Sequence, residues 1–292
     1  MKILENQEAQ VISLGESTLE NAEKLVEIAG RTCYKSLDRI TEGSAHKFVD
    51  RMISSNHTST LEHATIYLKF DYGDTRVPDM RYYAGPGGDL VYQFVNKKNV
   101  AKFSNVVTGK DHIYITTNYR VIIQNHLEEA LKYQCAYEPG HHVQRITVRL
   151  ITNLQILGEF TRHRTFSFNV ESTRYCNYSK DKFDNDITFL RPKFGIYSRS
   201  NEAIKEWESA MEKIEYKYMK LAKLGATAQE CAQVLPKATK VEMVMTATLP
   251  EWEAFFDLRL RGTTGAPHPQ AKEAAQLIYD QFKMNNILVK KV

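Results

Sequence analysis

The sequence predicts an α/β fold of the α+β type, in which a central mixed or antiparallel sheet is flanked by helices. Runs that alternate apolar and polar residues, as half-buried strands do, occur at about 63–72, 112–117, 145–152 and 240–248. Segments with apolar residues at helical spacing lie between them, and the longest covers about 201–224. Strands and helices mixed in this order favour a sheet packed against helical layers.

The first half of the chain is predicted to place a short strand at 9–14 before two helices. Ser17 or Thr18 caps the first helix and Gly30 ends it, and the second helix covers about 44–55. Residues 73–111 show the least legible pattern, and their first part, 73–89, which is rich in Gly, Pro and charge, is predicted to be loop. The remaining predictions of this half are helical spacing at 118–133 and a turn at 138–142 that leaves His141 and His142 on the surface.

The second half begins with a short helix at about 154–160, capped by Thr152 or Asn153. A second short helix covers about 228–234. Pro250 then begins a helix at its first position, where proline is favoured, and the final helix runs over 269–286. We expect residues 1–292 to form a single domain, with an insertion at about 73–144.

Composition limits the class of protein. The apolar content of 42% and charged content of 25% are ordinary for a globular protein, and the net charge is 39 − 35 = +4. This mild charge suits anionic small molecules and does not demand nucleic acid. Four scattered cysteines without a C-x-x-C pair indicate reduced thiols and no zinc site. The absence of a signal peptide and of an apolar run of about 20 residues predicts a cytoplasmic protein without a membrane partner.

Cations gather in one stretch, Arg162–Arg174, with the sequence RHRTFSFNVESTR. Arg162, His163 and Arg164 are consecutive, and two unit charges 4 Å apart interact by about 4 kcal/mol at an effective dielectric constant near 20. A bound phosphate would turn this repulsion into binding. The alternative is a surface turn in which the cations form a structural salt bridge with Glu171.

The spacing of this stretch, with RHR separated by seven residues from Ser172 and the following TRY, resembles the signature of the flavin-dependent thymidylate synthases. The similarity extends from about residue 31 to the C-terminus, with a poorly matched middle. Three further segments are similar to the family: NHTSTLEH (Asn56–His63), CNYSKDKF (Cys176–Phe183) and LRLRGTTGAPHPQ (Leu258–Gln270).

The resemblance implies an enzyme that converts dUMP to dTMP by reductive methylation. Members of the family take the carbon from 5,10-methylenetetrahydrofolate, carry the hydride on FAD and use NADPH as reductant. They also build each site from more than one chain. The resemblance therefore implies dUMP, folate and NADPH as partners in a homo-oligomer, most simply a homotetramer, without nucleic acid. The protein's part would be to orient the flavin and tune its surroundings.

The resemblance also assigns roles to residues. Arg259 would stabilise charge on the pyrimidine, and Ser172 joins it as a catalytic candidate that holds the nucleotide without forming a covalent intermediate. The positions assigned to the cofactor are His63, Thr65, Arg162, His163, Arg164, Val170 and Thr248. The positions assigned to the nucleotide are Glu159, Arg162, Glu171, Ser172, Thr173, Arg174 and Arg259. No metal ligand is implied.

Three residues depart from the family pattern. Ala232 stands where relatives often have an arginine that holds the nucleotide, and Thr248 stands where many have asparagine. Val170 occupies a position where relatives often carry Glu or Gln. Hydrogen bonds to charged groups are worth roughly 1.5–3 kcal/mol each, so either nearby residues compensate or affinity is reduced.

Each assignment has a structural alternative. Alone, His163 would be a histidine at a helix end, Glu159 a solvated helix residue, and Arg259 a cation that answers the helix dipole. His63 would be a residue at the start of a strand. The rival function is a non-catalytic nucleotide- or nucleic-acid-binding protein that keeps the anion pocket, because arginine with interleaved aromatic residues suits base stacking. The mild net charge argues against this rival function. A yellow colour of the purified protein would indicate the flavin enzyme and separate the two functions.

Overall fold

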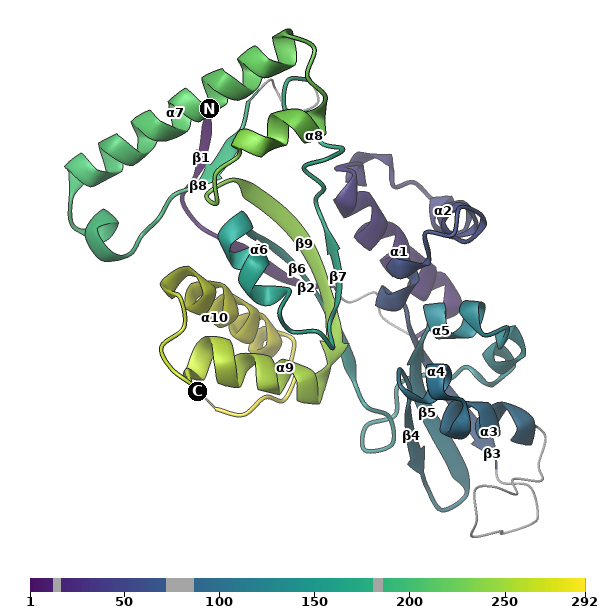
Figure 1. The fold of residues 1–292 in the computed structure, drawn as a ribbon. Coiled ribbons are helices and arrows are strands. Elements are labelled where there is room, and N and C mark those ends of the chain that lie inside the picture. The colour runs from purple at the N-terminus through teal and green to yellow at the C-terminus, as the bar shows by residue number, and fades with distance from the viewer. Residues whose placement is uncertain (13–16, 72–86, 181–185, 292) are drawn as a thin grey trace.

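The computed structural model describes residues 1–12, 17–71, 87–180 and 186–291, and its main sheet stands between helices (Figure 1). The predicted α/β class, with antiparallel sheets flanked by helices, is confirmed. The helices are α1 (Leu19–Cys33), α2 (Ser44–Ser54), α3 (Gly88–Asn96), α4 (Lys98–Ala101), α5 (Tyr119–Gln124), α6 (Leu154–Phe160), α7 (Asn201–Lys223), α8 (Ala228–Cys231), α9 (Leu249–Phe256) and α10 (Pro269–Met284). The strands are β1 (Lys2–Leu4), β2 (Glu8–Ile12), β3 (Thr65–Asp71), β4 (Asn105–Thr108), β5 (His112–Asn118), β6 (Arg145–Asn153), β7 (Ser167–Val170), β8 (Thr188–Leu190) and β9 (Lys240–Thr248).

The main sheet has the strand order β2-β6-β9-β7, and all its neighbours are antiparallel. The long strands β6 and β9 pair over their whole length, from Arg145 opposite Thr248 to Asn153 opposite Lys240. One face of the sheet packs against α6, α9 and α10 in a core that contains Trp252. The helix α1 contacts β9 and β7. Because β9 is enclosed in this way, all of its residues except Thr248 are buried.

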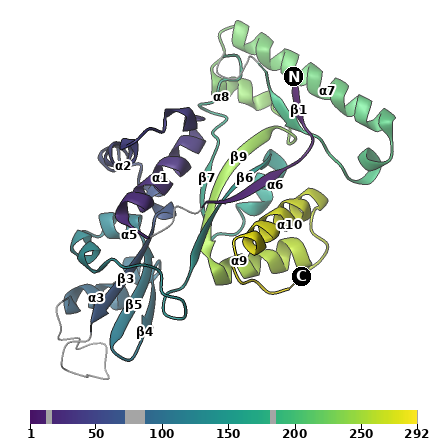
Figure 2. The ribbon, with the colours of Figure 1, turned by 180° about the vertical axis from the view of Figure 1, so that it is seen from behind.

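A second sheet, β3-β5-β4, lies beside the end of the main sheet and packs against α1, α2 and the helices of the insertion (Figure 2). The predicted loop at 73–89 lies mostly outside the described residues, and its last two residues begin α3. The rest of 73–111, for which no element was predicted, contains most of α3 together with α4 and β4. Val91, Phe94 and Val100 are fully buried against the second sheet. These elements are short and follow a Gly-rich segment, so periodicity alone did not reveal them.

The helix α7 packs with α8 and with the two-stranded parallel sheet β1-β8 at the end of the molecule where the N-terminus lies (Figure 1). The Ser200 side chain accepts a hydrogen bond from the Ala203 backbone nitrogen and so begins α7. The predicted boundaries of this helix are confirmed to within a residue. The short strands β1, β7 and β8 were not predicted, because three or four residues carry too little periodicity.

Two local predictions are wrong. The helix α1 continues past Gly30 to Cys33, and a Cβ atom at Gly30 would lie 2.5 Å from Cζ of Phe48. The glycine therefore permits the close approach of α2 and does not end α1. His142, predicted to be a surface residue, is buried, and its Nδ1 accepts a hydrogen bond from the Glu138 backbone nitrogen.

Candidate functional site

Three predicted site residues meet where α6 and α9 end. Arg259 donates from Nη1 to Oε2 of Glu159 at 2.9 Å, and from Nη2 to the Glu159 carbonyl oxygen at 2.6 Å. Its Nε donates to Nε2 of His163 at 3.1 Å. The guanidinium is therefore held along both edges, which fixes its plane in a way that a lysine ammonium could not reproduce.

The imidazole of His163 is neutral in this arrangement. Burial and the adjacent Arg259 cation lower its pKa to about 4. Since Nε2 accepts from Arg259, the proton of the neutral ring is assigned to Nδ1. The ring also lies 5.0 Å from the Phe255 ring, between centroids. His163 thus positions Arg259 without adding a second positive charge.

The backbone around Arg259 explains its placement. Glu251 accepts hydrogen bonds from the Thr248 backbone nitrogen and hydroxyl, both at 2.7 Å, and closes a capping box at the start of α9. After α9 the chain continues as a π-helical turn, Asp257–Arg261, which carries Arg259. π-Helical turns are uncommon in proteins, and many of those that occur lie at functional sites. Thr248, predicted to bind the cofactor, is therefore engaged as a helix cap.

A cavity of about 290 Å³ opens beside this cluster. Glu159 and Arg259 line it together with the segment that leads into α10. Its lining includes one carboxylate, one guanidinium and one imidazole. The residues that line it are Glu159, Leu258, Arg259, Thr264, Gly265, Ala266, Pro267 and His268.

Arg162 and Arg164 are exposed on the turn that connects α6 to β7. The backbone of this turn is held by hydrogen bonds from His163 to the Phe160 carbonyl and from Phe166 to the His163 carbonyl, at 3.0 and 3.1 Å. The turn therefore presents two guanidinium groups to solvent while His163 is directed to Arg259. The alternative of a salt bridge between these cations and Glu171 does not describe the structure, because Glu171 pairs with lysine.

The strand β7 separates two groups of predicted site residues. Arg162–Arg164 precede it and Glu171–Arg174 follow it, and four strand residues span about 13 Å. Val170 is the last residue of the strand and pairs with Met243. The structure therefore does not bring the RHR triplet and Ser172 together within one chain.

Glu171 belongs to a buried ionic cluster. Its Oε2 accepts from Lys240 Nζ at 3.0 Å and from the Glu242 backbone nitrogen at 3.2 Å. Glu242 forms a short contact with Lys240 and a 2.5 Å ion pair with Arg149. Burial alone would raise the pKa of Glu242, but Lys240 and the other cations outweigh it and lower the pKa to about 2. Glu171 is thus a structural anion and does not face an open site.

Ser172 and Thr173 are half-buried, and Arg174 is exposed. The Ser172 backbone nitrogen donates to the Cys33 carbonyl at 3.0 Å, which ties this segment to the end of α1. The Arg174 guanidinium carbon lies 5.4 Å from the centre of the Tyr175 ring. These three polar residues thus follow one another on a partly exposed segment.

His63 is fully buried, and its Nδ1 lies 2.8 Å from Oγ1 of Thr246. Burial and Arg145 lower its pKa to about 3, and Asn169 offsets this in part. Within the described part of the chain, neither Nε2 of His63 nor Nδ2 of Asn169 has a hydrogen-bond partner. The Asn169 side chain is close enough to His63 to hydrogen-bond with it. Turning its amide would place the oxygen toward Nε2, so these two atoms do not by themselves indicate a ligand.

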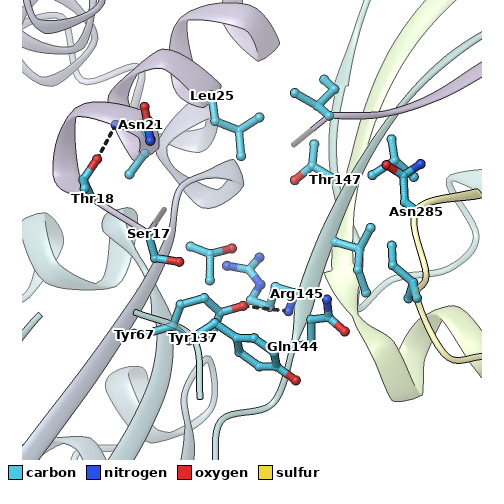
Figure 3. A pocket seen from close by; sticks show the side chains of 16 residues that line it. Ser17, Thr18, Asn21, Leu25, Tyr67, Tyr137, Gln144, Arg145, Thr147 and Asn285 are labelled. Atoms are coloured by element: carbon cyan, nitrogen blue, oxygen red, sulfur yellow. Dashed lines mark hydrogen bonds between the residues drawn. The ribbon is translucent and has the colours of Figure 1, made fainter. Parts of the chain in front are cut away.

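Thr65 lines a second, partly open cavity of about 290 Å³, which is bordered by β2, α1, β3, β6 and the residues after α10 (Figure 3). Arg145, Tyr67, Tyr137 and Gln144 lie together on one side of it in Figure 3. The Arg145 backbone nitrogen donates to the Tyr67 hydroxyl at 3.1 Å. The cavity combines aromatic rings with a cation, which suits a planar polar group.

Several residues that shape the sites were not predicted from the sequence. They are Lys35, Lys240, Glu242, Arg145 and Asn169. Lys240 and Glu242 lie two residues apart in a strand, which is the pattern of a solvated strand face. Among the residues described, no three His, Cys, Asp or Glu side chains are grouped to hold a metal ion. None of the described helices is long and apolar enough to span a membrane.

The α/β fold carries two separated groups of cations, the exposed Arg162 and Arg164 and the buried group around Lys240. The model of the thymidylate synthase complementing protein family, Thy1, matches residues 14–75 and 125–285. This match covers more than half of the chain, so the chain belongs to that family. The predicted resemblance to flavin-dependent thymidylate synthases is thereby confirmed.

Individual relatives are distant. The chain is 28% identical to the flavin-dependent thymidylate synthase of Pyrococcus abyssi over 102 residues, which is 35% of this chain and 40% of that protein. It is 24% identical to that of Synechocystis sp. over 140 residues, 46% of this chain and 65% of that protein. The matched part of each therefore spans less than two thirds of its length. A crystal structure of the UMP/dUMP methylase PolB from Streptomyces cacaoi, bound with 5-Br dUMP, is similar with a TM-score of 0.43 and 15% identity, covering 99% of this chain and 93% of that one.

Proposed function

We propose that this protein is a flavin-dependent thymidylate synthase, which converts dUMP to dTMP by reductive methylation. In this proposal 5,10-methylenetetrahydrofolate gives the carbon and NADPH is the reductant. Family membership supports the reaction class. The observation that carries the proposal is the meeting of Glu159, His163 and Arg259 beside a polar cavity, because these residues match the family's nucleotide and flavin positions.

The chemistry follows from the geometry of Arg259. Addition of a nucleophile at C6 of a uracil ring makes C5 nucleophilic and places negative charge on the C4 carbonyl oxygen. A guanidinium held in one plane by Glu159 and His163 is already oriented to stabilise that charge, so no reorganisation is needed during the reaction. The neutral His163 ring leaves Arg259 as the positive charge of this cluster.

FAD supplies the hydride when it is bound. The chain's residues fit such a group at the turn after α6, where the exposed guanidinium groups of Arg162 and Arg164 suit its phosphates. We also assign His63 to the cofactor, on the family motif alone, since its side chain is fully buried. Thr65, in the cavity beside Arg145, is the third contact that we assign to the cofactor.

Flavin binding is the first prediction. The protein should retain FAD stoichiometrically after desalting, and the variant Arg162→Ala/Arg164→Ala should lose most of it because the phosphates lose two cations. The measurement is the visible absorption spectrum of each desalted protein. Arg199→Ala, which removes an exposed arginine outside the site, is the control and should retain FAD. A colourless wild-type protein without a spectral change on FAD addition would favour the non-catalytic nucleotide binder.

The second prediction concerns assembly. We expect a homotetramer, as the family resemblance implies. Because β7 holds the RHR triplet and Ser172 apart, one chain would supply the part of a site with the RHR triplet, Glu159 and Arg259, and its neighbour the part with Ser172. Sedimentation velocity measures the mass directly. A mixture of Arg164→Ala and Ser172→Ala chains, refolded together, should regain part of the activity that each lacks, since some sites then combine two intact halves. An active monomer would contradict the shared site.

We also propose that the chain forms a single domain in which about 73–144 is an insertion. The family model supports this, because it leaves residues 76–124 unmatched between its two segments. The cysteines are free thiols, Cys33, Cys135, Cys176 and Cys231, which supports a cytoplasmic location in a reducing compartment.

A further inference from the structure

The cavity beside Arg259 holds a third polar side chain, the imidazole of His268. After the π-helical segment the chain turns at Gly262, whose φ of 69° is a left-handed conformation that suits a residue without a side chain. The Gly265 backbone nitrogen donates to the Gly262 carbonyl at 3.1 Å within this turn. The turn therefore brings His268 to the cavity that Arg259 and Glu159 also line.

The ring of His268 is fixed by two contacts. Its Nδ1 accepts a hydrogen bond from the Gln270 backbone nitrogen at 3.3 Å, and the Phe194 ring meets it edge-on, with centroids 5.0 Å apart. Because Nδ1 accepts, the proton of the neutral ring is assigned to Nε2. In the part of the chain that the structure describes, no group bonds to this second nitrogen. His268 therefore keeps one N–H donor for a ligand in the cavity.

Arg259 and Glu159 also keep hydrogen-bonding capacity. Three of the five N–H groups of the guanidinium donate to His163 and Glu159, so two remain. Glu159 accepts from Arg259 with Oε2 and from Gln155 with Oε1, whereas a carboxylate has room for about four hydrogen bonds. The two side chains are 17% and 21% exposed, so a ligand can reach them. The cavity thus offers a guanidinium donor, a carboxylate acceptor and an imidazole donor.

We propose that these three side chains recognise the edge of the uracil ring, with His268 as a specificity-determining residue. This inference rests on the proposed function and names the part of dUMP that the cavity contacts. The edge of uracil carries the C4 carbonyl, the N3–H and the C2 carbonyl, which accept, donate and accept a hydrogen bond. Arg259 and Glu159, which contact each other, serve the neighbouring C4 oxygen and N3–H, and His268 donates to the C2 oxygen.

Cytosine has the opposite pattern at two of these positions. Its C4 amino group is a donor and would meet the N–H groups of Arg259, and its N3 is an acceptor and would meet the Glu159 carboxylate. A ligand that leaves the polar groups of a site unpaired is strongly rejected, so the wild-type protein should bind dUMP at least about a hundredfold more tightly than dCMP. The amide of Glu159→Gln can turn to donate to N3, so this variant should narrow the difference about tenfold.

Two substitutions separate the donor at Nε2 from the helix cap at Nδ1. Isothermal titration of the FAD-loaded protein should show that His268→Asn weakens dUMP binding about tenfold, because asparagine keeps an acceptor for the Gln270 nitrogen but places no donor at Nε2. His268→Gln, whose longer side chain carries an NH₂ group to the region of Nε2, should keep most of the affinity. His126→Asn, which removes an exposed histidine outside the cavity, is the control and should bind dUMP as the wild type does.

A measurement on the unchanged protein supports the variants. 2-Thio-dUMP, whose sulfur is a weak hydrogen-bond acceptor, should bind the wild type about tenfold more weakly than dUMP if His268 donates to the C2 position. Asparagine is a favoured N-cap, so we expect His268→Asn to keep the start of α10, and thermal melting checks this. The 2-thio-dUMP comparison decides the contact if that variant is unstable.

The outcomes separate this inference from the proposed function. Wild-type affinity in His268→Asn, an equal loss in His268→Gln, or equal binding of 2-thio-dUMP and dUMP would overturn the role of His268 and leave the proposed function intact. Equal binding of dUMP and dCMP by the wild type would overturn the assignment of the uracil edge. A wild-type protein that binds FAD but not dUMP would overturn the proposed function and this inference with it.

Discussion

Single-turnover formation of dTMP should fall about 10²–10³-fold when Arg259 is replaced by alanine, the range found when one donor to a developing oxyanion is removed. The reason is geometric. Glu159 and His163 hold the guanidinium in one plane, so its charge is oriented before the ring accumulates negative charge. Arg259→Lys should recover little of the rate, because an ammonium lacks the planar fork. The assay starts from enzyme with its FAD already reduced, so it reports the nucleotide-dependent steps.

Arg261→Ala is the matched control for this variant. Arg261 lies in the same π-helical turn and forms ion pairs with Glu253 and Asp257. Its removal therefore breaks these structural ion pairs and leaves the contacts between Arg259 and Glu159 in place. FAD occupancy and NADPH-driven flavin reduction without nucleotide should stay near wild type in both variants. If Arg259→Ala forms dTMP at the wild-type rate, or if Arg261→Ala loses as much rate as Arg259→Ala, Arg259 is only a cation at a helix end.

The long elements could be predicted from the sequence because they repeat a pattern many times. β6 and β9 have nine residues each and α7 has twenty-three, so the alternation or helical spacing is unambiguous. The caps are local as well: the Asn153 side chain accepts from the Ile156 backbone nitrogen, as its position before an apolar run predicts. Elements of three or four residues such as β7 offer no such repetition.

The contacts of the site could not be predicted from any local pattern. Arg259 and Glu159 are one hundred residues apart in the chain, and their contact depends on α6 and α9 packing on the same face of the sheet. The sequence singled out both residues through the family's motif and not through their pairing. Glu171 shows the reverse case, because its motif position implied a nucleotide contact while the structure places it against Lys240. The assignment of Glu171 to the nucleotide therefore stays a prediction, and the burial of its side chain argues against it.

Lys240→Met is expected to destabilise the protein by about 3–5 kcal/mol, which is the cost of removing one partner of a buried ion pair. Lys240 lies closest to both Glu171 and Glu242, and the variant leaves two buried carboxylates with the more distant Lys35 and with Arg149. Urea unfolding at a fixed protein concentration measures the free energy, because assembly would otherwise shift the midpoint.

Two further variants distinguish electrostatics from packing at this position. Lys132→Met removes an exposed lysine that pairs with Glu129 and should change the free energy of unfolding by less than about 0.5 kcal/mol. Lys240→Met/Glu171→Met removes the pair together and should recover part of the loss, since replacing both partners by apolar groups avoids an unpaired buried charge. The single variant Glu171→Met completes the comparison. If the loss in the double variant equals the sum of the losses in Lys240→Met and Glu171→Met, the ion pair between Lys240 and Glu171 contributes nothing to stability. The buried charge would then not be what holds the segment from Glu171 to Arg174 in place.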